Sequence, residues 1–292
     1  MRGKRLLAVS VAVLVVALAA ALFILKESGK GGEGSGIIVV VTIPPQAEFV
    51  KRVGGEKVAV ITMVPQWANP HTYEPTPAQL MNVSKAKMYV KMGSGIEFEI
   101  AWMDKIKSIN ENMLIVDCSK GIELLKEDEK ADPHIWLSPK NAKIIVENIC
   151  EGLVQIDPAN STYYEQNKEA YLKELDALDK EISQILSKTS AHKFIVYHPA
   201  WSYFARDYGL EQISVEEGGK EPTPERIASI IEEAKRNNIT KIFASPQFKD
   251  KAEVIAKEIG GKVVEINPLS ENYIENMRKF AEELAKEGEN ER

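Results

Sequence analysis

The sequence contains little cysteine and little histidine. Two cysteines, Cys118 and Cys150, occur among 292 residues, and neither follows the apolar run at the N-terminus, which excludes a lipid-modified cysteine at that place. In an oxidising compartment the two thiols could form a disulfide. The other interpretation is two buried free thiols, and the sequence leaves both open.

Clusters of basic residues are also absent. The chain carries 37 Lys and Arg against 43 Asp and Glu, a formal net charge of −6, which argues against a nucleic-acid-binding protein. With 292 residues it is long enough for two domains with proper hydrophobic cores. Apart from its first residues, its composition is that of a soluble globular protein.

The first 36 residues differ from the rest. Three basic residues among the first five precede an apolar run, Leu6–Leu25, which as a helix would span about 30 Å, the thickness of a bilayer core. The basic residues predict a cytoplasmic N-terminus, and a cleaved signal peptide is the alternative. Residues 26–36, with five glycines, follow as a flexible tether. We therefore expect residues 1–36 to be a signal or membrane anchor with a linker, and the remainder to lie outside the cytoplasm.

A long helix is predicted near the middle of the chain, over residues 163–188. Neither Gly nor Pro interrupts it, and Asp157-Pro158 and Ser161-Thr162 ahead of it are typical of a helix start. Such a helix is about 40 Å long. From Tyr171 on, its apolar residues are spaced alternately four and three apart, as on one helix face. These apolar positions are Tyr164, Tyr171, Leu175, Leu178, Ile182 and Ile185.

Strands and helices alternate on both sides of this helix. The pattern predicts an α/β fold with two parallel-sheet lobes joined by one long rigid helix. The expected divisions are an N-terminal lobe over 37–158, a linking helix over 159–189 and a C-terminal lobe over 190–292. Ligands of parallel sheets bind beyond the carboxyl ends of the strands. We therefore expect the ligand in the cleft between the lobes.

Three of the four histidines occur in similar places. His71 and His134 each lie in a proline-bounded loop after a predicted strand, and His198 ends a strand and precedes Pro199. These three imidazoles should meet where the lobes face each other, whereas His192 belongs to the opposite edge. Three converging imidazoles favour zinc or a related divalent metal. The alternative is that each is an ordinary polar loop residue.

Three motifs carry a family resemblance. Residues 69–77 read NPHTYEPTP, residues 132–139 read DPHIWLSP and residues 198–204 read HPAWSYF. Together they resemble the zinc- and manganese-binding solute-binding proteins of ABC transporters, which include adhesin-like lipoproteins. The resemblance implies two α/β lobes joined by a rigid helix, with the metal between them. Its metal ligands correspond to His71, His134 and His198, and a histidine at the third position favours zinc over manganese.

The fourth ligand departs from the family pattern. The family usually has an Asp at the end of the last strand, where this chain has Asn267. Asn267 could bind weakly, water could take its place, or a carboxylate could substitute. The candidate carboxylates are Glu216, Glu217 and Glu271. The stretch 123–130 also lacks the His-rich loop of many zinc-type members and has acidic residues instead.

Four aromatic residues lie in or beside the same motifs. We expect Trp67, Tyr73, Trp136 and Trp201 to shield and orient the ligands. Ordinary packing between the lobes is the alternative, and the two roles are compatible.

These features predict a binding protein with no catalytic activity. We expect a monomer that is tethered to a membrane, captures Zn²⁺, or alternatively Mn²⁺, and delivers it to an ABC transporter permease. One rival is a zinc-dependent hydrolase, since three histidines with an open position resemble a catalytic zinc site. That rival needs a general base near the bound water, and the sequence has no HExxH element. The second rival is a surface adhesin that the metal only stabilises.

Overall fold

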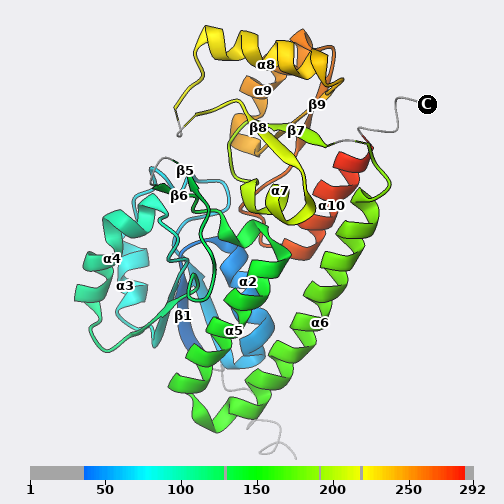
Figure 1. Ribbon diagram of the computed structural model, residues 1–292. Coiled ribbons are helices and arrows are strands. Elements are labelled where there is room, and N and C mark those ends of the chain that lie inside the picture. Colours follow the sequence, from blue (N-terminus) through cyan, green and yellow to red (C-terminus); the bar gives the residue numbers. More distant parts are fainter. Residues whose placement is uncertain (1–35, 128–129, 191, 218–219, 287–292) are drawn as a thin grey trace, which may run out of the picture. The chain divides into compact units, whose positions relative to one another are not determined.

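Two parallel four-stranded sheets organise the chain (Figure 1). The computed structural model describes residues 36–127, 130–190, 192–217 and 220–286. The first sheet has the order β2-β1-β3-β4, and its strands all run parallel. Its interior strand β1 contributes three fully buried valines to the core. The strands are β1 (Ile37–Val41), β2 (Val58–Thr62), β3 (Met88–Lys91) and β4 (Leu114–Asp117).

The second sheet is built in the same way. Its order is β10-β9-β7-β8, again with parallel pairing throughout. Strand β9 is buried along its whole length, as expected for an interior strand with helices on both faces. The strands are β7 (Lys193–Val196), β8 (Glu211–Ser214), β9 (Lys241–Ala244) and β10 (Lys262–Glu265).

Helices alternate with the strands of both sheets, as the sequence predicts. Side-chain caps fix several starts: Thr76, Ser138 and Thr223 each accept a hydrogen bond from the backbone N–H three residues on. The helices of the first half are α2 (Pro44–Gly54), α3 (Pro77–Val83), α4 (Glu97–Ile109) and α5 (Pro139–Ile156). Those of the second half are α7 (Ser202–Tyr208), α8 (Pro224–Arg236), α9 (Lys249–Glu258) and α10 (Tyr273–Ala285).

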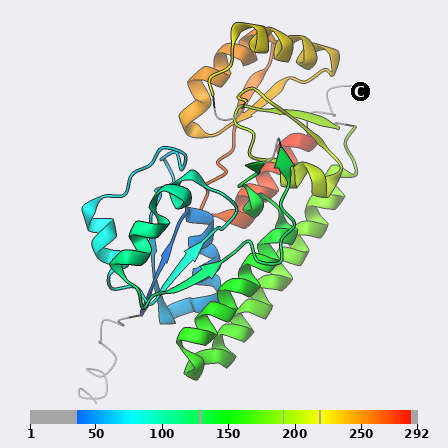
Figure 2. The ribbon, with the colours of Figure 1, turned by 60° about the vertical axis from the view of Figure 1, so that its left-hand side comes forward.

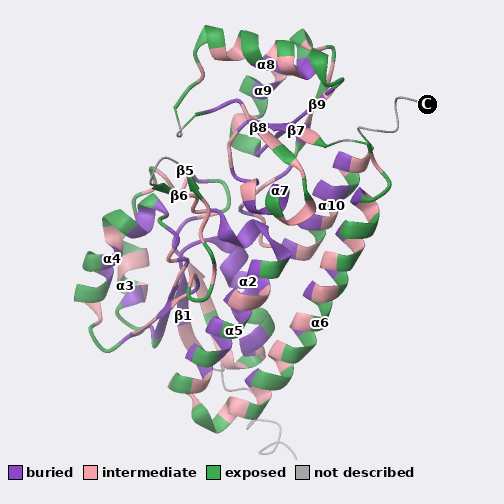
Figure 3. Cartoon of the chain, in the orientation of Figure 1, coloured by how far each residue is buried: buried purple, intermediate pink, exposed green. Residues whose placement is uncertain are grey.

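The long helix is confirmed as α6 (Ser161–Leu186), 26 residues. It packs against both α5 and α10, so it touches a helix from each half of the chain (Figure 2). Figure 3 shows the buried stripe on the side that faces these helices. The buried residues of α6 are Tyr164, Tyr171, Leu175, Leu178, Ile182 and Leu186.

The two sheets belong to one compact unit, residues 37–292. Contacts bind the halves together: Glu48 on α2 accepts hydrogen bonds from the Tyr171 hydroxyl, at 2.8 Å, and from the Tyr273 backbone N–H, at 2.5 Å. The division into lobes at 159 and 190 stays a prediction.

A small hairpin replaces part of the predicted acidic loop. Strands β5 (Lys126–Glu127) and β6 (Lys130–Ala131) pair antiparallel. A strand of two residues is too short to produce a periodic pattern, so these strands could not be predicted from the sequence. Asp128 and Glu129 lie outside the described residues.

Two further expectations concern the cysteines and the N-terminal segment. Cys118 and Cys150 are both buried free thiols, so the disulfide alternative was wrong. The predicted anchor and linker, residues 1–36, lie outside the described residues except for Gly36. Within the described part of the chain, none of the helices combines the length and the apolar character needed to cross a bilayer.

Candidate metal centre

Three histidine side chains converge at the carboxyl ends of the strands. His71 comes from the loop between β2 and α3, His134 from the turn before the 3-10 helix η2 (Ile135–Leu137), and His198 from the end of β7. The Nε2 atom of His198 lies 3.4 Å from that of His71 and 3.3 Å from that of His134. The potential ligand atoms of all three lie within 4.8 Å of one another. His192 is exposed, just before β7 and therefore at the opposite end of that strand.

The distances between the Nε2 atoms can be compared with those in a zinc site. Zinc binds histidine nitrogen at about 2.0–2.1 Å, so neighbouring nitrogens of a tetrahedral site lie about 3.3–3.4 Å apart. Two of the three Nε2 pairs already have that spacing. Two edges of the group therefore have the length of a tetrahedral edge, and all three imidazoles are close enough to share one ion, which leaves a position for another donor.

Each of the three imidazoles has a carboxylate on its outer nitrogen. Because an ionised carboxylate can only accept, each Nδ1 carries the proton, and the Nε2 lone pair is left to face the other two rings. This is the usual support for a metal-bound histidine. The distances are 2.6 Å from His71 Nδ1 to Glu97 Oε2, 2.8 Å from His134 Nδ1 to Asp132 Oδ1 and 2.8 Å from His198 Nδ1 to Glu216 Oε2.

The electrostatics favour these protonation states. Burial lowers the pKa of His198, and the hydrogen bond to Glu216 offsets part of that shift. The hydrogen bond from His71 lowers the pKa of Glu97. Burial of Asp132 works against its ionisation, but the hydrogen bonds and charge of His134 outweigh it and lower the pKa of that carboxyl. At neutral pH the carboxylates behind His71 and His134 are therefore ionised.

Two of the histidines sit in the same kind of turn. In the segment 69–71 the Asn69 side-chain oxygen accepts a hydrogen bond from the His71 N–H at 3.0 Å, and Asp132 does the same for His134 at 2.9 Å. Such Asx turns tie a side-chain oxygen to the backbone two residues on. Asp132 thus fixes both the backbone and the ring of His134.

Aromatic rings enclose the site only in part. Trp136 is buried, with its ring centroid 5.3 Å from that of His134, and its Nε1–H donates to the Pro268 carbonyl at 2.8 Å. Phe248 lies nearly parallel to the His198 ring at 6.0 Å, a neighbour that the sequence analysis missed. The cavity between them is lined by Asn69, Pro70, His71, Ile96, Glu97, Pro133, His134, Trp136, His198, Ser245, Gln247, Phe248, Asn267, Pro268 and Leu269.

The other predicted aromatic residues lie away from the ligands. Trp67 is 76% exposed, so the expectation that it shields the metal was wrong. Tyr73 packs against Phe98 and its hydroxyl donates to Gln79. Trp201 is buried against Phe280, with ring centroids 3.8 Å apart, which fits the alternative of ordinary packing.

The candidates for the fourth ligand differ in position. Asn267 lines the cavity, with its side-chain oxygen accepting from the Leu269 N–H at 2.9 Å. Glu216 is buried behind His198, where it orients that ring.

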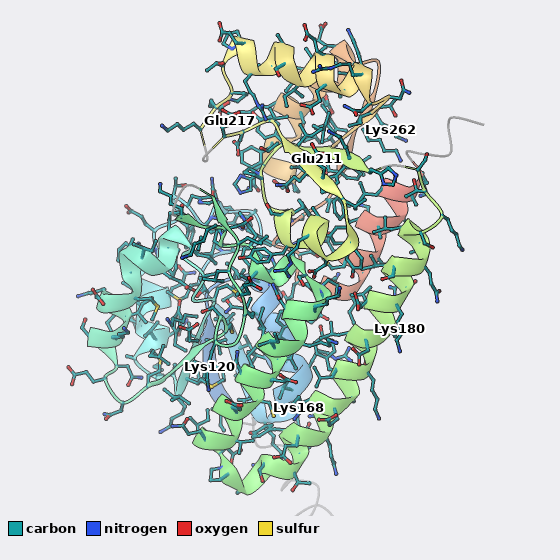
Figure 4. The ribbon with its side chains drawn as sticks, viewed as in Figure 1. Lys120, Lys168, Lys180, Glu211, Glu217 and Lys262 are labelled. Carbon is teal, nitrogen blue, oxygen red and sulfur yellow. The ribbon has the colours of Figure 1, made fainter. Side chains whose placement is uncertain are left out.

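Glu217 and Glu271 pair with cations elsewhere. Glu217 lies on the segment between β8 and α8 (Figure 4). It pairs with Arg226, and Glu271 pairs with Lys51. Among the described residues that line the cavity, Glu97 is the one carboxylate. The structure therefore places none of the three predicted glutamates there, because each is held by another partner.

Sequence reasoning also missed Glu97. It is the first residue of α4, 26 positions beyond His71, and nothing in its local pattern distinguishes it from a solvated acidic residue at a helix start. An acidic residue placed after a strand end of the same sheet is the one signal that could have suggested it.

Comparison with known proteins places these features in a family. The profile of the family described as zinc-uptake complex component A, periplasmic, matches residues 39–287. The high-affinity zinc uptake system protein ZnuA of Bacillus subtilis (strain 168) is 32% identical over 84% of this chain and 83% of its own length. The manganese ABC transporter substrate-binding lipoprotein PsaA of Streptococcus anginosus is 30% identical over 82% of each chain. A solved structure described as the crystal structure of ZnuA superposes with a TM-score of 0.83 at 42% identity, covering 86% of this chain and 99% of the other.

Proposed function

Because this chain belongs to the family of the periplasmic component A of zinc-uptake complexes, we propose that it captures Zn²⁺ outside the cytoplasm and delivers the ion to an ABC transporter permease. The ion is its cargo, and the chain carries out no reaction on it. The observation that carries the proposal is the convergence of three imidazoles, with two of the three Nε2 pairs at the spacing of a tetrahedral zinc site.

The ligands in this proposal are His71, His134 and His198. Three neutral imidazoles bring no charge, so the cation would keep its full charge inside the cleft. The carboxylates behind the rings supply negative charge close by and make each imidazole a better donor. Water or Asn267 would complete the tetrahedron.

Zinc suits this set of donors better than manganese does. Imidazole nitrogen is a common zinc ligand, whereas manganese favours carboxylate and other oxygen donors. The cavity offers three imidazoles, and Glu97, the one carboxylate among its described lining residues, is held by His71. Calorimetric titration of the full chain with Zn²⁺, Mn²⁺ and Fe²⁺ tests this choice. We expect one zinc per chain and the tightest binding for zinc, and tighter binding of manganese would reverse the assignment.

We also propose that the apolar run Leu6–Leu25 tethers the protein to the membrane, and that the protein acts as a monomer. The length of the run and the glycine-rich stretch after it support the tether. Fractionation of cells that express the full chain, compared with a chain that begins at residue 37, tests it.

Among the described residues around the three histidines, each carboxylate that could serve a hydrolase as general base already has a partner. Glu97, Asp132 and Glu216 each already accept a hydrogen bond from a histidine, and a base must be within reach of the metal-bound water. Zinc-dependent hydrolysis of generic esters or peptides would favour that alternative. The adhesin alternative predicts that metal-depleted protein loses its fold, whereas the structured core of both halves supports folding without the ion.

Zinc affinity should fall on acidification. Protons compete with zinc for imidazole nitrogen, so affinity is expected to change little above about pH 7 and to decrease below about pH 6.5, the reference value for histidine. Burial lowers the pKa of His198, so this ring stays available to more acidic pH than an exposed histidine would. Titrations between pH 8 and pH 5 measure the profile. An affinity that stays constant down to pH 5 would indicate a carboxylate-dominated site.

The substitution Asn267→Asp should raise zinc affinity, on the order of tenfold or about 1.4 kcal/mol. One carboxylate oxygen can keep the hydrogen bond from the Leu269 N–H, and the other can face the cation. A carboxylate also offsets charge that an amide leaves in place. Calorimetry on Asn267→Asp and Asn267→Ala measures both effects. If neither variant differs from the wild type, Asn267 does not contact the ion.

A further inference from the structure

The three histidine–carboxylate pairs differ in their access to solvent. Asp132 and Glu216 have side chains that are 13% and 6% exposed, whereas the side chain of Glu97 is 51% exposed. Of the three rings, His71 is also the most exposed, at 26% against 9% for His134 and 14% for His198. One pair, His71 with Glu97, therefore lies at the rim of the site, and the other two lie inside.

The backbone beneath Glu97 is held firmly. Two positions further along α4, Glu99 is buried and accepts hydrogen bonds from the Thr42 hydroxyl and from the backbone N–H groups of residues 92 and 93. In the same loop the Ser94 hydroxyl donates to the Pro133 carbonyl, next to His134. The backbone of Glu97 is therefore held in place, although its carboxylate is exposed to water.

The loop that carries His71 is held less firmly on its outer side. Trp67 in this loop is 76% exposed. The hydrogen bond that links the loop to the other half of the chain, from Asn267 Nδ2 to the Gln66 carbonyl, is 3.5 Å long, at the limit for such a bond. By contrast, His134 directly precedes the buried residues Ile135–Leu137, and His198 directly follows the buried residues Phe194–Tyr197.

We propose that Glu97 is the positioning residue for His71, and that this pair is the movable arm of the site, which binds an entering cation last and releases a departing cation first. The inference rests on the proposed function for its kinetic part. Glu97 acts through the ring of His71 and does not itself touch the ion.

A movable arm has a specific kinetic signature. If the bond from His71 to the ion forms last, it is absent from the transition state of association. Weakening His71 then destabilises the bound state alone, so the loss of affinity appears as faster release. A ligand that binds early, such as His198, contributes to the transition state as well, and weakening it also slows association.

Two isosteric substitutions test this signature. Glu97→Gln and Glu216→Gln make the same chemical change behind His71 and behind His198, and loss of such a support typically costs about 10–100-fold in metal affinity. Association and release of Zn²⁺ are measured by stopped flow, with a chelating dye in excess for release. For Glu97→Gln we expect release about tenfold faster or more, with association unchanged. For Glu216→Gln we expect slower association. If Glu97→Gln slows association by the factor that it costs in affinity, or changes neither rate, the movable arm is overturned.

The positioning role is tested without metal. In the wild type the ring of His71 should show the tautomer with the proton on Nδ1, visible in the ¹⁵N chemical shifts of the imidazole at a fixed, mildly alkaline pH. Glu97→Gln should keep this tautomer, because the amide oxygen can still accept from Nδ1–H. Glu97→Ala should lose it, whereas the tautomers of His134 and His198 should not change.

The outcomes separate this inference from the proposed function. A wild-type protein that does not bind zinc would contradict the proposed function, whatever the tautomer of His71. A wild type that binds zinc, with a His71 tautomer that is the same in Glu97→Ala, would contradict the role of Glu97 alone.

Discussion

Replacing His134 with alanine is expected to weaken zinc binding by more than about 100-fold, since loss of the carboxylate behind a ligand already costs about 10–100-fold. His134 is the least exposed of the three rings and is fixed twice by Asp132, through its N–H and through Nδ1. It is therefore the ligand that the fold holds most firmly. Calorimetry on the purified full chain measures the loss.

A matched control is available in His192. It is exposed and lies before β7, away from the other histidines. His192→Ala should bind zinc as the wild type does, which shows that the loss in His134→Ala is not a general effect of removing an imidazole. Circular dichroism should show both variants folded. Unchanged affinity in His134→Ala would remove the site as described.

The second large effect is expected in the long helix. Leu175 is fully buried on the side of α6 that packs against α5 and α10. Leu175→Ala leaves a cavity there and should lower the free energy of unfolding by about 2–5 kcal/mol. Denaturant titration measures this difference, with Lys173→Ala on the exposed side of the same helix as the control, which we expect to stay within about 0.5 kcal/mol of the wild type.

This prediction also separates stability from binding. If α6 serves as a rigid support, Leu175→Ala should keep its zinc affinity under conditions where it remains folded. A variant that is as stable as the wild type would mean that α6 contributes little to the core. A folded variant with much weaker zinc binding would mean that the helix sets the geometry of the site directly.

The parts of this structure that produce a periodic sequence pattern could be predicted from the sequence. The spacing of apolar residues in α6 and the alternation of strands and helices are periodic, so they are visible in a single sequence. The convergence of His71, His134 and His198 followed from their common place after strands, because parallel strands present their carboxyl ends at one edge.

The missed features depend on how individual side chains point. Glu216 was one of three candidate substitutes for the fourth ligand, but the segment after β8 places its carboxylate at the outer nitrogen of His198. Glu97 was not considered, because its contact with His71 joins a loop to the start of α4, and no local pattern connects the two. Trp67 was expected to shield the site and instead points to solvent. The spacing of the motifs predicts which segments lie close together, whereas the conformation of the loops determines which atoms are in contact.

The central claim is that three imidazoles bind one zinc ion, and X-ray absorption at the zinc edge on the zinc-loaded protein tests it most directly. The account predicts a first shell of nitrogen and oxygen at about 2.0–2.1 Å with four donors, and outer scattering from three imidazole rings. A spectrum with sulfur bound to the zinc, or with scattering from fewer than three imidazoles, would contradict it.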